Sequence, residues 1–247
     1  MTPPKPCPQI SVLMYHQVGR FAKPSAHRSC YCDVGRFRDQ MAFLKFAGYR
    51  AVSLSQAYAA LFSGKPLPGR SVVLSFDDGY ENFADHALPV LADYGYPSAL
   101  FAVSGLLGQT ARWLDGGGDA PLLSAARLRE LRQSKVEIGS HSVSHPRLSR
   151  LPPAQVWREV ADSKAELEAA LGEAVAFFAY PYGDYSPDVR DAVAKAGYQA
   201  ALTCSRGAAN TAANAFEIPR KAIAYGDDLF GVFWKIAVKN RRKDRHG

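Results

Sequence analysis

The chain has 247 residues, of which 47% are hydrophobic and 21% charged, and its formal net charge is +7 at pH 7. This composition is enough to bury one large core, and α/β barrels of this size often do not divide, so we expect a single domain over residues 1–247. The four cysteines exclude a disulfide framework in a chain this long, and their spacing excludes a Cys-x-x-Cys zinc site.

The positive charge is concentrated at the C-terminus. From about residue 235 the sequence contains Lys235, Lys239, Arg241, Arg242, Lys243 and Arg245. No aromatic motif for nucleic acid accompanies them, so we expect no nucleic-acid partner. The apolar segment 229–239 beside this tail could be an interfacial helix in peripheral contact with an anionic membrane, or a terminal helix packed on the domain. Residues 1–9 lack the apolar segment of a secretory signal and no stretch is long enough to span a membrane, so we expect a cytoplasmic, membrane-proximal protein.

Strands and helices alternate along the sequence, which indicates parallel βαβ units. Short apolar runs predict strands at 10–15, 51–54, 72–76, 98–103, 136–139, 175–179 and 199–203. Apolar residues at helical spacing predict helices at 33–48, 55–62, 80–94, 125–133, 152–171 and 187–196. We expect residues 17–32 and 218–221 to be irregular, and the Gly-rich residues 105–121 to form a long loop on the active face.

The strand predicted at 72–76 ends in two consecutive carboxylates, Asp77 and Asp78, followed by Gly79. The carboxyl end of a strand in an α/β sheet is where ligands bind. Taken alone, however, Asp-Asp-Gly is more typical of a turn or a helix cap.

A second polar cluster follows the strand at 136–139. His141 and His145 are four residues apart, a spacing that lets two imidazoles on one side of a helical turn bind one ion, although His-rich turns also occur as polar surface loops. Because both clusters follow strands of one βαβ series, we expect them to meet at one rim. Two imidazoles and one carboxylate would leave coordination positions open for water and substrate, and the second carboxylate could accept a proton from that water.

These residues resemble the signature motifs of a known family. Ser75-Phe76-Asp77-Asp78-Gly79 and His141-Ser142-Val143-Ser144-His145-Pro146 are similar to the first two motifs of the polysaccharide deacetylases, the NodB-homology or carbohydrate esterase family 4 domain, and Tyr180-Pro181-Tyr182-Gly183 is similar to the third. The motifs occur in the family's order. The resemblance implies the α/β class, a distorted seven-stranded (β/α) barrel, and metal-dependent removal of an acyl group from an amino sugar.

The resemblance also implies a role for each motif residue. One divalent metal ion, zinc in the first place and nickel, cobalt or iron as alternatives, would have as its ligands Asp78, His141 and His145. The ion would polarise the acetyl carbonyl and Asp77 would take a proton from the attacking water, while the backbone N–H of Tyr182 would help to stabilise the oxyanion. The substrate would contact the third motif at Tyr180, Pro181 and Tyr182.

The sequence departs from the commonest family pattern in its proton donor. A late Leu-x-His motif usually supplies the acid, but the only histidine after His145 is His246. The segment Leu13-Met14-Tyr15-His16-Gln17-Val18 resembles the N-terminal motif of the branch that includes the poly-N-acetylglucosamine deacetylases, where a histidine on the first strand has this role. The resemblance therefore makes His16 the candidate acid.

A second departure concerns the partner of the base. Ala179 occupies the position where many members of the family carry an arginine that orients the catalytic carboxylate. We suggest that Arg220, in the sequence Ile-Pro-Arg, substitutes for it. The alternative is an ordinary surface arginine after a proline.

The implied function is deacetylation of an N-acetylated amino sugar in a glycan or a glycolipid, for example a lipid-linked sugar. One alternative is a catalytically silent carbohydrate-binding module with the same fold, and another is a deformylase of the same family that acts on a lipid-linked sugar. The intact set of two aspartates and two histidines argues against the silent module, because a binding module has no need of a base beside the metal.

Overall fold

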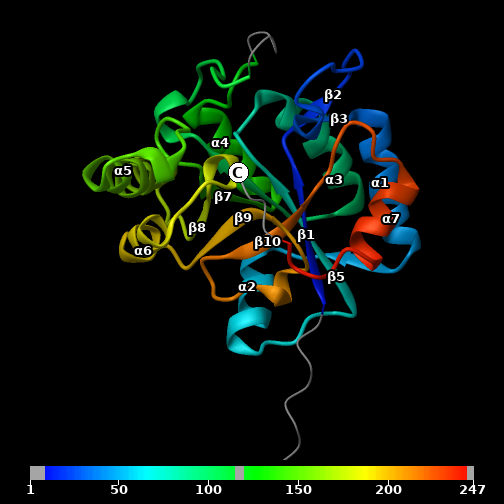
Figure 1. Cartoon of the computed structure of the whole chain (residues 1–247). Coiled ribbons are helices and arrows are strands. Elements are labelled where there is room, and N and C mark those ends of the chain that lie inside the picture. The colour runs from blue at the N-terminus through cyan, green and yellow to red at the C-terminus, as the bar shows by residue number, and fades with distance from the viewer. Residues whose placement is uncertain (1–8, 115–119, 244–247) are drawn as a thin grey trace, which may run out of the picture.

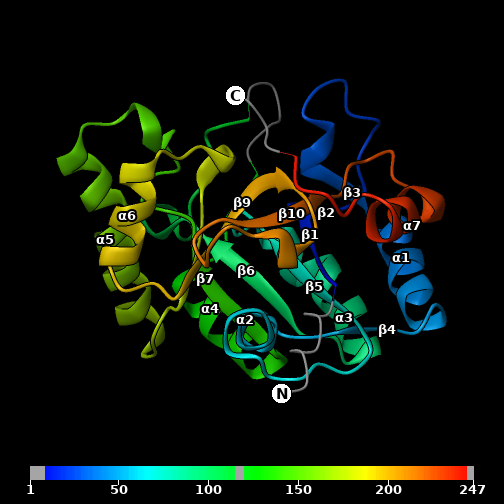
Figure 2. The ribbon, with the colours of Figure 1, turned by 60° about the horizontal axis from the view of Figure 1, so that its bottom comes forward.

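The fold is a closed barrel of parallel strands (Figures 1 and 2). The computed structural model describes residues 9–114 and 120–243, so the Pro-rich start and Arg245 of the basic tail lie outside the described residues. Hydrogen bonds join the barrel strands in the order β1-β10-β9-β8-β7-β6-β5, and β5 pairs with β1 to close the ring. The predicted seven-stranded α/β barrel is confirmed. Its strands are β1 Ile10–Tyr15, β5 Arg70–Phe76, β6 Ser98–Ala102, β7 Val136–Ser140, β8 Phe177–Ala179, β9 Ala200–Arg206 and β10 Ile218–Ala222.

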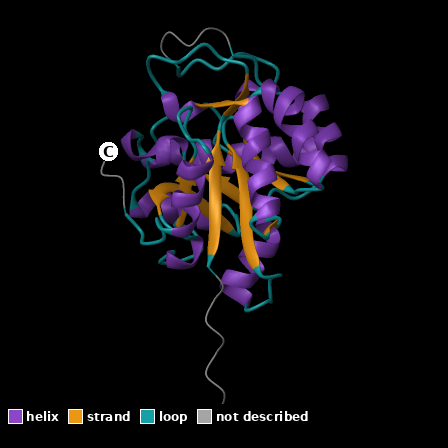
Figure 3. Cartoon of the chain, turned by 90° about the vertical axis from the view of Figure 1, so that its right-hand side faces the viewer, coloured by secondary structure: helices purple, strands orange, loops and turns teal. Residues whose placement is uncertain are grey.

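Helices are arranged around the strands (Figure 3). In the described part of the chain the α-helices are α1 Val34–Phe46, α2 Leu54–Ser63, α3 Leu88–Tyr94, α4 Ala125–Leu131, α5 Pro153–Leu171, α6 Pro187–Lys195 and α7 Leu229–Ala237. Helix α2 lies across the amino-terminal end of the barrel (Figure 2), where the carboxylate of Glu137 accepts a hydrogen bond from the backbone N of Leu54 at 2.6 Å. This end is therefore closed, and the opposite end is left for a site.

Strand β10 is the largest error of the sequence prediction, which expected residues 218–221 to be irregular. Pro219 has no N–H group, and proline inside a run normally argues against a barrel strand. The structure accommodates it with a register shift in the β9–β10 pairing between Ile218 and Arg220. Beyond the shift, Lys221 pairs with Leu13 of β1, so this strand closes the barrel.

Three other expectations need correction. The strand predicted at 51–54 is β4, Tyr49–Ala51, which pairs with β5 outside the ring, while Leu54 already begins α2 because Ser53 caps that helix. The helix predicted at 80–94 contains a π-helical turn at Phe83–Ala87, which widens the backbone just before Pro89, a residue without an N–H group. Residues 17–32 are not wholly irregular, since β2, Gln17–Gly19, pairs with β3, Tyr31–Asp33.

The alternation of side chains along each strand determines which residues enter the barrel. Ile10 and Val12 of β1 and Val73 of β5 belong to the inner core with α2, whereas Leu13 and Leu74 belong to the outer core beneath the helices. Successive side chains of a strand point to opposite faces. If this alternation continues to the end of each strand, four side chains point towards the barrel axis: His16, Asp77, His141 and Arg220.

Candidate active site

The three sequence motifs meet at the carboxyl-terminal rim of the barrel. They follow β5, β7 and β8, and the carboxyl ends of parallel strands lie on the same side. A cavity of about 300 Å³ opens there, and its lining includes Asp77, Asp78, His141, His145 and Tyr182. The expected meeting of the aspartate pair and the histidine pair is therefore observed.

Asp78 lies between the two histidines. Its Oδ1 is 3.3 Å from Nε2 of His141 and 3.2 Å from Nε2 of His145. Burial raises the pKa of Asp78, but the hydrogen bonds from the two imidazoles outweigh it and hold this pKa well below its ordinary value. Nδ1 of His141 donates to the carbonyl oxygen of Ala179 at 2.7 Å, which fixes the ring and leaves Nε2 directed at Asp78.

These residues fit a divalent transition-metal ion. The potential ligand atoms of the three residues lie within 4.8 Å of one another, all three are buried, and no second group of this kind occurs in residues 9–114 and 120–243. The backbone is strained where it presents them: Asp78 has a φ of 74° and His145 a φ of 62°, in the left-handed region that favours glycine. One carboxylate and two imidazoles are a donor set of catalytic zinc sites, in which further positions stay open.

Asp77 is held by a buried arginine. Nη1 and Nη2 of Arg220 donate to Oδ1 and Oδ2 of Asp77 at 2.6 and 2.7 Å, and Nε donates to the carbonyl oxygen of Thr203 at 3.0 Å. Arg220 is only 1% exposed, so the alternative of a surface arginine is wrong and the expected contact with Asp77 is present. Burial raises the pKa of Asp77, but the Arg220 guanidinium brings it below the ordinary value, which keeps this carboxylate ionised at neutral pH.

Two further histidines line the cavity. His16 follows β1 directly, and its Nδ1 is buried with no hydrogen-bond partner among the described residues. It lies close enough to Asp77 and Asp78 to contribute to the lowering of their pKa values. His27 is exposed and adopts a left-handed backbone with a φ of 49°. Either could transfer a proton within the cavity.

The third motif requires a correction. Tyr180 and Pro181 were expected to contact the substrate, but both are buried and neither lines the cavity. Tyr180 instead donates its hydroxyl to the carbonyl oxygen of Phe216 at 3.1 Å. Only Tyr182, 42% exposed, reaches the cavity, where its ring lies 4.6 Å from that of His145. A Cβ on Gly183, whose φ is 69°, would be 2.5 Å from the Cβ of Cys204, so this turn needs glycine.

Sequence reasoning missed Trp113 and Arg147. The indole of Trp113 stacks on the ring of His145 with centroids 4.1 Å apart, and its Nε1 donates to the hydroxyl of Tyr80 at 3.2 Å. The guanidinium of Arg147 lies 4.5 Å from the ring centroid of Tyr182. The signal for Trp113 was an aromatic residue in a glycine-rich loop that was expected on the active face. The signal for Arg147 was a positive charge two residues after His145, a candidate metal ligand.

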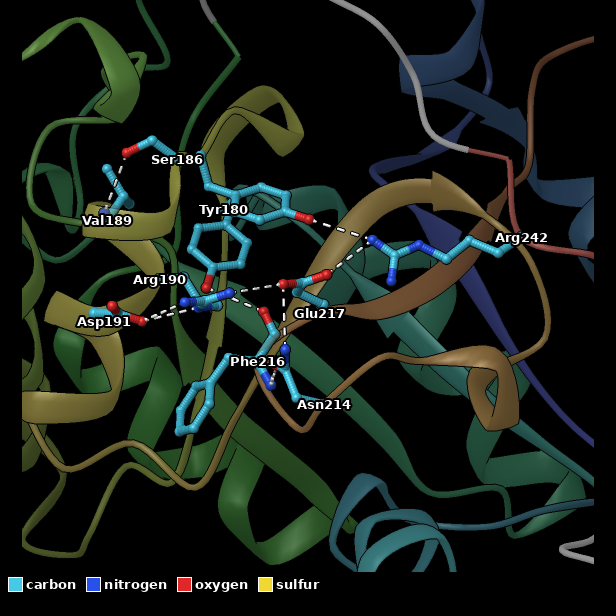
Figure 4. Close-up of polar contacts among 10 residues, drawn as sticks. Tyr180, Ser186, Val189, Arg190, Asp191, Asn214, Phe216, Glu217 and Arg242 are labelled. Atoms are coloured by element: carbon cyan, nitrogen blue, oxygen red, sulfur yellow. Dashed lines mark hydrogen bonds and ion pairs between the residues drawn. The ribbon is translucent and has the colours of Figure 1, made fainter.

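Glu217, in the loop that precedes β10, binds two arginines from distant parts of the chain (Figure 4). Its carboxylate accepts hydrogen bonds from Arg190 of α6 at 3.2 Å and from Arg242 near the C-terminus at 2.9 Å. The neighbouring residue, Phe216, receives the Tyr180 hydroxyl, and Arg220 follows three residues later. Glu217 therefore fastens the loop that precedes β10 to α6 and to the C-terminal segment, and the Tyr180–Phe216 hydrogen bond joins the same loop to the third motif.

Replacing Glu217 by Gln should lower the free energy of unfolding by about 1–3 kcal/mol, because two arginines lose their charged acceptor. Burial raises the pKa of Glu217, but the hydrogen bond from Arg242 and those from Asn214 and Arg190 bring it below the ordinary value of 4.5. The contribution of the carboxylate is thus complete at neutral pH and is lost as the pH falls below 4.5. Urea denaturation at several pH values measures the difference.

Asp191→Asn is the matched control, since Asp191 also binds Arg190 but its side chain is 66% exposed. We expect its effect to stay within about 0.5 kcal/mol. Equal destabilisation by the two substitutions would contradict the role given to Glu217.

Comparison with known proteins gives consistent results. YxkH of Bacillus subtilis (strain 168) is 27% identical over 227 residues, which cover 91% of this chain and 76% of YxkH. The poly-beta-1,6-N-acetyl-D-glucosamine N-deacetylase of Escherichia coli (strain K12) is 28% identical over 232 residues, and the chain spans 33% of that protein's length while 78% of the chain is covered.

The same relationship is found among solved structures. The Streptococcus pyogenes deacetylase PplD in complex with acetate superposes with a TM-score of 0.81 and 25% identity, covering 92% of this chain and 98% of PplD. The sequence model of the family described as polysaccharide deacetylase matches residues 64–201, more than half of the chain and all three motifs. The chain belongs to the polysaccharide deacetylase family.

Proposed function

We propose that this protein is a metal-dependent hydrolase that removes N-acetyl groups from amino sugars of a glycan or glycolipid. The observation that carries the proposal is the division of labour between two adjacent carboxylates. Asp78 faces two imidazoles, whereas Asp77 faces Arg220 and takes no part in the cluster of potential ligands. A carbohydrate-binding module would have no need of this second, separately oriented carboxylate.

Asp78, His141 and His145 would hold the ion. When bound, a divalent ion supplies Lewis acidity to the acetyl carbonyl and lowers the pKa of a water molecule. Asp77 accepts the proton of the attacking water, and Arg220 keeps its carboxylate ionised and in one orientation. The backbone N–H of Tyr182 donates to the oxyanion, and the strained turn at this residue, with a φ of 59°, holds the peptide at the cavity.

The substrate class rests on the named relative and on the cavity. The Escherichia coli relative acts on poly-beta-1,6-N-acetyl-D-glucosamine, and we propose an N-acetylated amino sugar for this chain. Trp113 and Tyr182 both contact the His145 ring and supply aromatic surfaces on which a sugar ring can pack. The cavity volume of about 300 Å³ suits one sugar residue with its acetyl group.

The decisive experiment measures acetate release from oligomers of N-acetylglucosamine and from lipid-linked sugars. Purified protein should be depleted of metal with a chelator and then resupplied separately with zinc, nickel, cobalt or iron. We expect acetate release to disappear when the metal is removed and to return when a divalent ion is added back, with zinc as the first candidate. Glycan binding without acetate at any of these ions would instead indicate a silent module, and release of formate in place of acetate would indicate a deformylase.

His16 is proposed as the acid that protonates the leaving amine. His16→Ala should therefore lower acetate release from an amide substrate about a hundredfold or more. Hydrolysis of an activated aryl acetate should fall far less, because its phenolate leaves without a proton. The ratio of the two rates distinguishes loss of an acid from general damage to the site.

His27→Asn is the matched control, since it removes the other cavity histidine at a left-handed position that asparagine tolerates. This variant should keep the wild-type ratio. If His16→Ala retained full amide turnover, or if the amide-specific loss appeared in His27→Asn, the acid would not be His16.

A further inference from the structure

Helix α7 has one buried and one exposed face. Val232 and Ile236 are buried, and Nζ of Lys221 donates to the carbonyl oxygen of Ile236 at 3.2 Å and to Oδ1 of Asn240 at 2.6 Å, which fixes the helix and the residues after it. The packing of this segment on the barrel, one of the two alternatives from the sequence, is thus present. It accounts for only half of the helix, because the outer face remains apolar and open to solvent.

The exposed face carries large side chains that a solvated helix would not need. The exposed fractions are 68% for Phe230, 50% for Val238 and 43% for each of Leu229, Phe233 and Trp234. Phe230 and Trp234 stack on each other at a centroid distance of 6.3 Å, so these two rings form one apolar patch.

The apolar face continues onto α1. Phe43 of α1 meets Phe233 edge to face at 6.2 Å, and Figures 1 and 2 show the two helices side by side on the same flank of the barrel. One helical turn beyond Phe43 lies Phe46, which at 91% exposed is the most exposed large hydrophobic residue in the described part of the chain. We define the α1/α7 apolar surface as Phe46, Leu229, Phe230, Phe233, Trp234 and Val238.

Basic residues adjoin this surface. Between residues 229 and 239 the sequence contains Lys235 and Lys239, and the acidic residue that precedes them, Asp228, caps the helix by accepting from the backbone N of Gly231. Lys235 is bound to Asp227, and residues 240–243 lie away from the surface, where Lys243 pairs with Arg206 at the end of β9. The cations that adjoin the surface are Lys45 beside Phe46, Lys239 beside Val238, and Arg70, which lines one pocket with Phe233. Contiguous exposed apolar surface next to positive charge is typical of sites that bind anionic partners.

We propose that the α1/α7 apolar surface binds peripherally to an anionic lipid bilayer, with its aromatic side chains in the headgroup region and the basic residues on the lipid phosphates. A second copy of the chain is a poorer occupant, because a symmetric contact would bring the same positive charges together. Among the described residues, no helix has both the length and the apolar character needed to cross a bilayer. The contact is therefore one of attachment to the surface.

The attachment leaves the catalytic cavity uncovered. The cavity opens at the carboxyl ends of the strands, whereas α1 and α7 lie on the flank of the barrel (Figure 1). A bound protein can therefore reach sugars that project from the same membrane. The surface shares no residue with the cavity lining, so lipid binding and deacetylation can be tested separately.

The experiment uses the full chain with vesicles of phosphatidylcholine, with and without phosphatidylglycerol, and measures the fraction that cosediments. The wild-type chain should bind the anionic vesicles and be released by salt. The double variant Phe230→Ser/Trp234→Ser should lose at least about tenfold in binding, because two aromatic side chains leave the interface. Lys45→Gln/Lys239→Gln should weaken binding to anionic vesicles in particular.

Trp157→Ser provides the matched control, because Trp157 on α5 is an aromatic residue of similar exposure, at 39%, outside the α1/α7 apolar surface. It should bind like the wild type, and all variants should release acetate from soluble oligomers at the wild-type rate. Three outcomes would overturn the proposal: no binding to anionic vesicles, equal loss in Trp157→Ser, or a concentration-dependent dimer that Phe230→Ser/Trp234→Ser abolishes in the absence of lipid binding. Because binding is measured without substrate, its failure would leave the proposed deacetylase activity untouched.

Discussion

Replacing Asp77 by Asn should reduce acetate release about a thousandfold or more and leave the bound metal in place, because the variant keeps the shape of the side chain but cannot accept the proton. The structure indicates that this substitution removes the base without removing a potential metal ligand. Asn can still accept one hydrogen bond from Arg220, while the three potential ligand atoms belong to other residues. Steady-state acetate release and metal analysis of the same preparation test both halves of the expectation.

Asp78→Asn is the informative companion. It alters the residue whose Oδ1 faces both imidazoles, so it should lower metal content as well as activity. Full acetate release by Asp77→Asn with metal still bound would remove the proposed base. Loss of metal from Asp77→Asn and retention by Asp78→Asn would show that the two roles are reversed.

Replacing Arg220 by Met should destabilise the protein by about 3–5 kcal/mol and abolish most activity, because the buried Asp77 would lose its compensating charge. Arg220 and Asp77 are 1% and 2% exposed, so water cannot take the place of the guanidinium. Arg220→Lys keeps the charge but not the bidentate geometry, and should fall between the wild type and Arg220→Met in both properties. Denaturant unfolding and acetate release measure the series.

The double variant Arg220→Met/Asp77→Asn separates the two causes. It should be more stable than Arg220→Met alone, because no uncompensated carboxylate remains, yet it should be as inactive as Asp77→Asn. Stability of Arg220→Met equal to the wild type, or additivity of the two substitutions, would show that the pair does not act as a unit.

The amino-acid pattern predicted those parts of the molecule whose physical cause is local. Apolar runs predicted the barrel strands up to β9, and the apolar stripe Val156, Val160, Leu167 and Leu171 correctly identified α5. The motifs that follow β5 and β7 were expected at one rim because parallel strands share a direction. In each case the prediction needed only the spacing of apolar residues, every two residues in a strand or every 3.6 in a helix, or the point at which an apolar run ends.

Features fixed by tertiary contacts escaped prediction. Strand β10 contains Pro219, whose effect on pairing is absorbed by a register shift that only the neighbouring β9 reveals. Tyr180 stands in a motif associated with substrate, but the carbonyl oxygen of Phe216 provides a partner that makes burial of its hydroxyl favourable. The stacking of Trp113 on His145 joins residues of different loops, and no local pattern encodes it.

The closure of the barrel by β1 and β10 has a consequence for how the chain folds. Leu13 pairs with Lys221, so the last barrel contact joins residues near opposite ends of the sequence. Contacts of such sequence separation form slowly, and during synthesis β10 is the last barrel strand to leave the ribosome. Until then the edges of β1 and β9 that will receive β10 have no strand beside them. The nascent protein therefore depends on late ring closure to protect these edges from pairing with other chains.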